Sequence, residues 1–430
     1  IVYHDIFSNG ITYFDLGFDL QTIPQNLIPY LGLFGTVLLE MGTESEDFVR
    51  LTQRIGSKTG GISTSTVATE KYDRSGSALW MFLRAKGTQT QNEDMLAILS
   101  DILLTLKLDD KDRFKQIVLT EKASTEARLV PIGHMMVASR LGSHFTLSGW
   151  VREQMGGVSY LFFLRELANR IDNDWAGVLA DLDSLRKHLI NRETMICNIT
   201  LDAPNWDKFQ PKLEAFIRAM PSNGAQKATW TPIHPSDHEG LSIPAQVNYV
   251  GKAGNLYNAG FEMHGAMHVA INYLRIDYLL NRIRIQGGAY GAFASFDPAS
   301  GIFGYGSYRD PNLLRTLDVY DATADFLRGQ ALSDDELTKN IIGVIGDFDP
   351  YLLPDAKGYT SLNRYLVNIS DEQRQKTRDQ VLSTTNADLK KVADALDVVK
   401  NGHIVVLGSK DAITKANSER GNFLKVTPIL

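Results

Sequence analysis

The chain has 430 residues, of which 43% are hydrophobic and 22% are charged, a composition typical of globular proteins. This length is too great for a single core and predicts two domains of about 200 residues each. The formal net charge of −6 argues against a nucleic-acid-binding protein.

The cysteine count and the apolar segments indicate in which kind of compartment the protein is expected. Cys197 is the only cysteine, so an intrachain disulfide is excluded and a reducing compartment is favoured. We expect its side chain to be buried in a strand. The most apolar early run, 27–42, contains Pro29 and is too short to span a membrane, so no membrane association is expected. The chain begins at Ile1 without a signal sequence, and we expect a processed product or a fragment.

The first half alternates strands and helices. Alternating apolar residues predict strands, and apolar residues at helical spacing predict helices. In chain order, we expect a strand at 10–20, a buried helix at 27–42, a Gly/Ser/Thr-rich stretch at 54–70, a strand at 78–87, a long helical region at 92–129, a helix at 176–190 and a buried strand at 195–202.

A linker and a second half follow. Residues 221–244 contain four prolines and little periodicity, which predicts a linker between domains at 1–220 and 245–430. Capping boxes are predicted where Ser333 precedes Glu336 and where Ser370 precedes Gln373. The expected elements of the second half are a strand at 246–263, a helix at 268–283, a hairpin turning at DPASG (297–301), a helix at 313–329 and a strand at 402–411.

The two halves share a loose internal symmetry. RIGSKTGG (54–61) parallels RIRIQGG (282–288), and LDDKDRFKQ (108–116) parallels LSDDELTKN (332–340), in the same order and at similar spacing. This repetition indicates a duplicated unit. We therefore predict an α+β fold of two similar domains, each a mostly antiparallel sheet packed with helices.

Two histidine-rich stretches are candidate metal sites. HPSDH (234–238) has two histidines, but Pro235 and its place in the linker disfavour the helix that a zinc-protease motif requires, so we expect a solvated loop. HGAMH (264–268) has helical spacing but no carboxylate between its histidines. We expect a helix start with one buried and one exposed histidine, and no metal ligands in either stretch.

Arg284 and Tyr290 are the strongest candidate site residues. Gly287 and Gly288 lie between them and would leave the backbone approachable. Tyrosine could donate a hydrogen bond to an oxyanion, and arginine could hold a carbonyl or carboxylate. The alternative is structural, with Arg284 capping helix carbonyls and Tyr290 half-buried.

The segment GGAYGAFASFDPASGIFGYGSYRDPNLLRTLDVYDATADFLRG (287–329) resembles the presequence proteases, a group of pitrilysin/insulinase-like zinc peptidases. The segments at 40–63, 149–164, 246–255 and 353–359 are similar to the same family. The resemblance covers nearly the whole chain, and it is to the C-terminal half of these enzymes.

The resemblance implies a role in a larger enzyme. The family's enzymes have four similar α+β domains, and the two halves close like a clamshell around an unfolded peptide. The catalytic zinc and its HxxEH motif belong to the N-terminal half. This sequence has no HxxEH, so the cofactor zinc is expected only in the complete enzyme, held by an N-terminal partner half, and this chain alone is expected to be inactive.

Site residues also follow from the resemblance. The family carries an arginine and a tyrosine that reach the substrate across the closed chamber, and these correspond here to Arg284 and Tyr290. Arg282 is a competing assignment for the arginine. Gly287, Gly288 and Ala289 are expected to contact the peptide.

The implied function is the degradation of short unfolded peptides, such as cleaved targeting presequences, by a zinc metalloendopeptidase. The family suggests the mitochondrial matrix or the plastid stroma, with the bacterial cytoplasm as the alternative. A second reading of the function is a non-catalytic subunit that binds peptides or scaffolds a complex.

Overall fold

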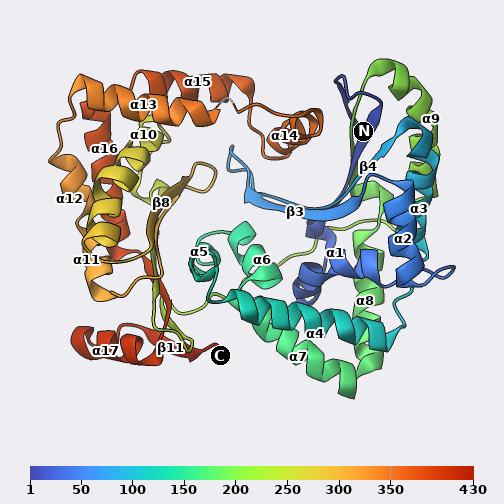
Figure 1. Cartoon of the computed structure of the whole chain (residues 1–430), viewed down its shortest axis with the longest axis horizontal. Helices are drawn as coiled ribbons and strands as arrows, with labels where there is room; N and C mark the ends of the chain where they lie inside the picture. The colour runs from blue at the N-terminus through green and yellow to red at the C-terminus, as the bar shows by residue number, and fades with distance from the viewer. Residues whose placement is uncertain (349) are drawn as a thin grey trace.

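The computed structural model describes residues 1–348 and 350–430, which form two mixed helix-and-sheet domains (Figure 1). The first sheet has the strand order β1-β5-β2-β4-β3. Its pairs are antiparallel except for β1 with β5. The bounds of its strands are β1 (Val2–Asp5), β2 (Ile11–Asp19), β3 (Ile62–Glu70), β4 (Ser77–Thr88) and β5 (Met195–Leu201).

Helices cover one face of the first sheet. The core on this face joins apolar strand residues such as Phe14 and Leu83 to helix residues such as Phe34 and Ile98, all almost fully buried. Cys197 lies in β5 and is 2% exposed, as predicted, and burial raises the pKa of its thiol to about 12. The helices of this half are η2 (Gln25–Tyr30), α1 (Leu31–Glu40), α2 (Phe48–Lys58), α3 (Asn92–Leu104), α4 (Lys111–Arg128), α5 (Gly133–Gly142), α6 (Leu147–Gly156), α7 (Val158–Asn173), α8 (Trp175–Leu189) and α9 (Ala203–Ala219).

The second sheet has the strand order β11-β6-β10-β7-β9-β8. The first helix of this half, α10 (Ala266–Tyr273), continues directly into a π-helical segment, η6 (Leu274–Ile285). The strands are β6 (His238–Ser242), β7 (Tyr249–Asn255), β8 (Gly291–Asp297), β9 (Ile302–Tyr308), β10 (His403–Gly408) and β11 (Lys425–Pro428). The helices are α10 (Ala266–Tyr273), α11 (Leu314–Asp321), α12 (Thr323–Arg328), α13 (Asp334–Phe348), α14 (Pro354–Leu366), α15 (Asp371–Leu382), α16 (Asn386–Leu396) and α17 (Lys410–Arg420).

The two sheets have the same topology, as the internal symmetry of the sequence predicted. In each, the first and last strands of the unit pair in parallel, β1 with β5 and β6 with β10. The remaining strands follow antiparallel in the same order, and β11 is an addition to the second sheet. The two glycine pairs fall at equivalent places, just before the edge strands β3 and β8. The α+β fold of two similar domains is therefore confirmed.

One helix of each domain packs against the sheet of the other domain. α5 of the first half packs on β7, β9 and β10, so Val137 and Leu141 share a core with Tyr249 and Val405. α14 of the second half packs on the outer face of the first sheet, where Leu362 meets Phe82 and Ala78. Figure 1 shows α5 and α6 between the two sheets, with the edge strands β3 and β8 toward the middle of the molecule.

Several sequence expectations need correction. The helical region at 92–129 is two helices, α3 and α4, and the helix at 313–329 is broken into α11 and α12. The strand expected at 246–263 ends at Asn255. The segment expected as a linker at 221–244 is irregular only to residue 237, because β6 already pairs with β10 in the second sheet.

Local features agree with the sequence elsewhere. Both predicted capping boxes form, since Ser333 and Glu336 exchange hydrogen bonds of 2.9 and 3.4 Å, and Ser370 and Gln373 exchange bonds of 2.9 and 3.2 Å.

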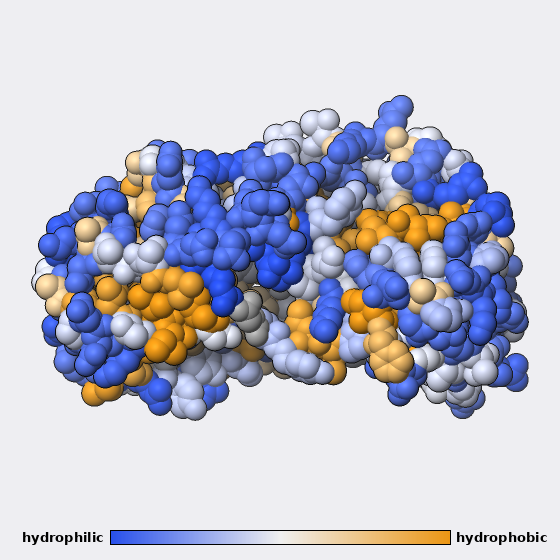
Figure 2. Space-filling model, turned by 90° about the horizontal axis from the view of Figure 1, so that it is seen from above, coloured by the Kyte–Doolittle hydropathy of each residue, from blue (hydrophilic) through white to orange (hydrophobic). Residues whose placement is uncertain are grey.

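Across the described part of the chain, no helix is both long and apolar enough to cross a membrane. Viewed from above, the surface is mostly hydrophilic with separate apolar patches, and it is hollowed near the middle (Figure 2).

Candidate substrate-facing site

Arg284 and Tyr290 lie on either side of a tight turn between η6 and β8. The N–H of Gly288 donates to the Arg284 carbonyl at 2.9 Å, and the N–H of Ala289 donates to the Ile283 carbonyl at 3.1 Å. Gly288 has φ +79°, a conformation that disfavours residues with a side chain. A Cβ at Gly287 would lie 2.4 Å from the Ile283 carbonyl oxygen. The sequence therefore needs both glycines to turn from the helix into the strand.

The turn brings the arginine and the tyrosine together. The Arg284 guanidinium lies 5.8 Å from the centre of the Tyr290 ring, within the range of a cation–π contact. Tyr290 is 66% exposed, and Arg284 is also exposed. The Arg284 side chain makes no hydrogen bond or ion pair with another residue that the structure describes. It does not cap the helix carbonyls, so the two side chains are free to meet a ligand.

The neighbouring candidates differ in accessibility. The Arg282 guanidinium lies against Gln286, with 3.5 Å between Nη1 and Oε1. Gly288 is exposed, whereas Ala289 is 4% exposed and can offer no side-chain contact. The Gly287 carbonyl already accepts a hydrogen bond of 2.6 Å from the Asn312 amide. Of the three residues expected to contact a peptide, Gly288 is the one with an open surface.

An aromatic chain leads from Tyr290 to the first domain. Tyr290 donates its N–H to the Tyr308 carbonyl at 3.0 Å, and the two rings pack edge to face at 5.6 Å. Tyr308 in turn contacts the ring of His134 at 4.8 Å, and His134 stacks on Phe293 at 5.5 Å. His134 comes from α5, so the site is built by both domains.

A cavity of about 320 Å³ opens beside this aromatic chain, between α5 and the hairpin of β8 and β9. His134, Val137 and Leu141 line one side, and Phe293 and Phe296 line the other. Burial lowers the pKa of His134, so its ring is neutral at neutral pH. The cavity has a largely apolar wall, with Arg152 and Asp297 as charged lining residues, and Tyr308 and His134 connect it to Tyr290.

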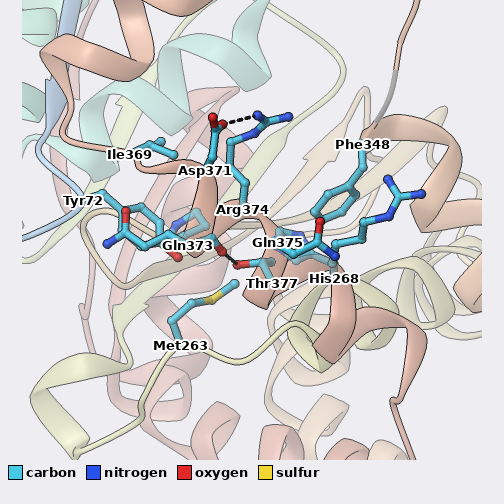
Figure 3. A pocket seen from close by; sticks show the side chains of 12 residues that line it. Tyr72, Met263, His268, Phe348, Ile369, Asp371, Gln373, Arg374, Gln375 and Thr377 are labelled. Carbon is cyan, nitrogen blue, oxygen red and sulfur yellow. Dashed lines mark hydrogen bonds and ion pairs between the residues drawn. The ribbon is translucent and has the colours of Figure 1, made fainter.

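A second cavity, of about 410 Å³, lies elsewhere, between the first-domain hairpin at Tyr72 and helix α15 (Figure 3). Its visible polar contacts are local to α15: Asp371 pairs with Arg374 at 2.8 Å, and the Thr377 hydroxyl donates to the Gln373 carbonyl at 2.9 Å. Neither Arg284 nor Tyr290 lines either cavity, but His134 and Phe293, which belong to the aromatic chain that starts at Tyr290, line the first one. We therefore centre the candidate site on the first cavity.

The groups around Tyr290 do not fit a catalytic zinc ion. Apart from the single imidazole of His134, the group consists of an arginine, phenols and a phenyl ring, which are not the carboxylate, imidazole or thiolate ligands that zinc takes. Within residues 1–348 and 350–430, three side chains suited to a metal gather in one other place, at His144, Asp237 and His403. The Arg284–Tyr290 pair thus supplies no zinc ligand of its own.

The histidine-rich stretches differ in part from expectation. Residues 234–237 are irregular, with His234 and Asp237 exposed, as expected for a loop, but His234 Nδ1 lies 2.8 Å from the Ser143 carbonyl oxygen and His238 already starts β6. His264 and His268 are both half-buried at the start of α10. His134, Tyr308 and Phe293 were not anticipated as site residues, because no motif links positions so far apart in the chain.

Comparisons with known proteins define the class. The family model for the domain associated with M16 peptidases of subfamily C matches residues 1–167, and the model for the PreP C-terminal domain matches residues 238–410. A crystal structure described as a peptidase M16 inactive domain, from Pseudomonas fluorescens, superposes with a TM-score of 0.67 at 14% identity and covers 95% of this chain and 94% of its own. The chain belongs to the peptidase M16 family.

The relatives specify the branch within that family. Presequence protease 1 of Arabidopsis thaliana, chloroplastic/mitochondrial, is 41% identical over 100% of this chain and 40% of its own length. The mitochondrial presequence protease of Saccharomyces cerevisiae is 26% identical over 93% and 42%, and Protein HypA of Clostridium perfringens is 29% identical over 99% and 43%. The chain corresponds to the C-terminal half of a presequence protease, and it spans about two fifths of the length of these relatives.

Proposed function

We propose that this chain is the C-terminal half of a zinc metalloendopeptidase that degrades short unfolded peptides such as cleaved presequences. The observation that carries the proposal is the exposed Arg284 beside Tyr290, in a chain that aligns over its whole length with a presequence protease. In this role the chain closes one side of the peptide chamber, and an N-terminal half closes the other.

The chemistry of the pair fits that role. When bound by the other half, zinc would supply an activated water for peptide hydrolysis. The Tyr290 hydroxyl donates a hydrogen bond to the oxyanion that develops on the scissile carbonyl. Arg284 holds a neighbouring carbonyl of the peptide. The contact of Arg284 with the Tyr290 ring favours it over Arg282, whose side chain lies against Gln286.

Peptide binding is supported by the strand that follows the turn. β8 is the outermost strand of its sheet, so one side of its backbone is open to an added strand. Phe293 is 40% exposed on this strand and also lines the 320 Å³ cavity. An extended peptide paired along β8 would place an apolar side chain there. Unfolded peptides suit this arrangement because their backbone groups are free to pair.

The relatives also suggest a location. Presequence proteases of plants and yeast are named for chloroplasts and mitochondria. We propose the mitochondrial matrix or plastid stroma, and the relative from Clostridium perfringens supports the bacterial cytoplasm as the alternative. The resemblance to an inactive domain supports a second function, that of a non-catalytic peptide-binding or scaffold subunit.

A reconstitution experiment tests the proposal. The purified 430-residue chain is mixed with the N-terminal part of the same protein, and zinc-dependent cleavage of a quenched fluorescent peptide is measured. We expect no cleavage by the chain alone, and cleavage that saturates at equimolar mixing. Zinc-dependent cleavage by this chain alone would contradict the assignment.

The mass of the natural product separates the two functions. The chain has a mass of 47.8 kDa and covers 40% of its plant relative. A half-enzyme predicts a natural polypeptide, or a stable complex with a zinc-binding partner, of more than twice that mass. A natural product of the chain's own mass, without a zinc-binding partner, supports the scaffold subunit.

A further inference from the structure

Three metal-binding side chains meet at the seam between the domains. His144 follows α5 in the first domain, Asp237 ends the irregular connection, and His403 begins β10 in the second domain. One ligand atom from each lies within 4.8 Å of the others. We propose that these residues bind a divalent first-row transition-metal ion, zinc foremost, in a site distinct from the Arg284–Tyr290 site.

The distance between two of the ligand atoms suits such an ion. His403 Nδ1 lies 3.4 Å from the Asp237 carboxylate oxygen, and two ligands at tetrahedral zinc are separated by about 3.3 Å. The rings of His144 and His403 stack at 4.5 Å with 15° between their planes. Because the three ligand atoms are up to 4.8 Å apart and the two rings are stacked, Asp237 and the rings must rotate before all three atoms bind one ion.

Several imidazole nitrogens at the seam make no hydrogen bond to a described residue, although the Asp237 carboxylate lies 3.4 Å from His403 Nδ1. His144 Nε2 and His403 Nδ1 are buried without a hydrogen bond in the described part of the chain, and the same holds for His238 Nδ1 nearby. Buried polar atoms are nearly always paired, so such a cluster calls for an explanation. A metal ion satisfies His144 and His403 at once, and water can fill the fourth position.

Charges of both signs surround the cluster. Arg140 pairs with Glu239 at 2.7 Å and with Glu153 at 3.1 Å, so one guanidinium faces two carboxylates. Glu239 directly follows His238 in β6. Arg140 opposes a positive charge at His144, so the negative charge at the cluster itself comes from the Asp237 carboxylate.

The donor set specifies the class of metal. Imidazole ligands suit zinc, nickel, cobalt and copper, whereas calcium and magnesium require mainly oxygen. Three protein ligands with one open position can hold zinc. The ligands come from both domains and from the connection between them, so the ion would hold the seam closed.

Zinc binding to the untagged 430-residue chain tests the proposal. After treatment with EDTA, zinc is titrated by calorimetry, and cobalt is added separately as an optical probe. We expect one zinc ion per chain, visible absorption bands of four-coordinate cobalt, and a Tm raised by about 3 °C at saturating zinc. His144→Ala and His403→Ala should each weaken zinc binding by about 100-fold or more.

Matched variants keep the test decisive. His188→Ala removes an exposed histidine on α8 and should leave the affinity unchanged. Asp237→Asn changes an exposed side chain, so it should weaken zinc binding without affecting folding. This variant keeps the test possible if either histidine variant fails to fold. Absence of zinc binding to the parent chain, or parental affinity in all three ligand variants, overturns the proposal. Neither readout depends on peptide cleavage, so the outcome is independent of the proposed function.

Discussion

Arg140 is a side chain that joins several elements across the seam. Its guanidinium from α5 makes two hydrogen bonds to Glu239 of β6, at 2.7 and 2.9 Å, and one to Glu153 of α6, at 3.1 Å. All three side chains are at most 12% exposed. Burial raises the pKa of Glu153, which shows the cost of burying its charge. The two carboxylates are tolerated because one guanidinium serves both.

Replacing Arg140 with methionine should therefore be strongly destabilising. The change keeps much of the volume but leaves two buried carboxylates without a cation, and the expected loss is about 3–5 kcal/mol in the free energy of unfolding. Urea denaturation in EDTA measures it. Lys115→Met is the control, because the solvent-exposed pair with Asp172 should contribute little to stability. Equal effects of the two substitutions would refute the role of Arg140.

At the scale of elements, the turn between η6 and β8 sets the geometry of the site. The glycine pair in the sequence indicated an open backbone followed by a strand, because glycine tolerates backbone conformations that other residues do not. It predicted 268–283 as one helix but could not show that the helix continues as a π-helical segment to Ile285. Such segments depend on packing and often occur at functional sites.

Gly288→Ala tests the importance of this turn. A side chain at φ +79° should cost about 1–2 kcal/mol in stability and shift Tyr290 relative to Arg284. Gly346→Ala in α13 is the matched control, because its Cβ would meet no atom within 4 Å and alanine favours the helix by up to about 1 kcal/mol. Thermal unfolding compares the two, and a Gly288→Ala protein as stable as the parent would argue against a strained turn.

At the scale of the whole molecule, the sequence predicted a duplicated α+β fold, and the matching order of strands in the two sheets confirms it. It could not predict that each domain covers the other's sheet with a helix, α5 in one direction and α14 in the other. This exchange brings His134 beside Tyr308, and His144 beside His403. Both neighbourhoods depend on contacts between residues far apart in sequence, which local patterns do not encode.

The central claim is that Tyr290 and Arg284 bind a peptide substrate next to a zinc ion that the N-terminal half of the enzyme holds. It is tested in the complete two-half enzyme. Arg284→Ala should reduce turnover, whereas Arg282→Ala, on the same exposed helix end, should change it little.

The most direct measurement is turnover and peptide affinity of the Tyr290→Phe enzyme, because this change removes only the hydroxyl group. The account predicts a fall in kcat on the order of 10²-fold, as for loss of one oxyanion donor, with little change in the Kd of the peptide. An unchanged kcat would mean that Tyr290 only packs against Tyr308, and would contradict the account.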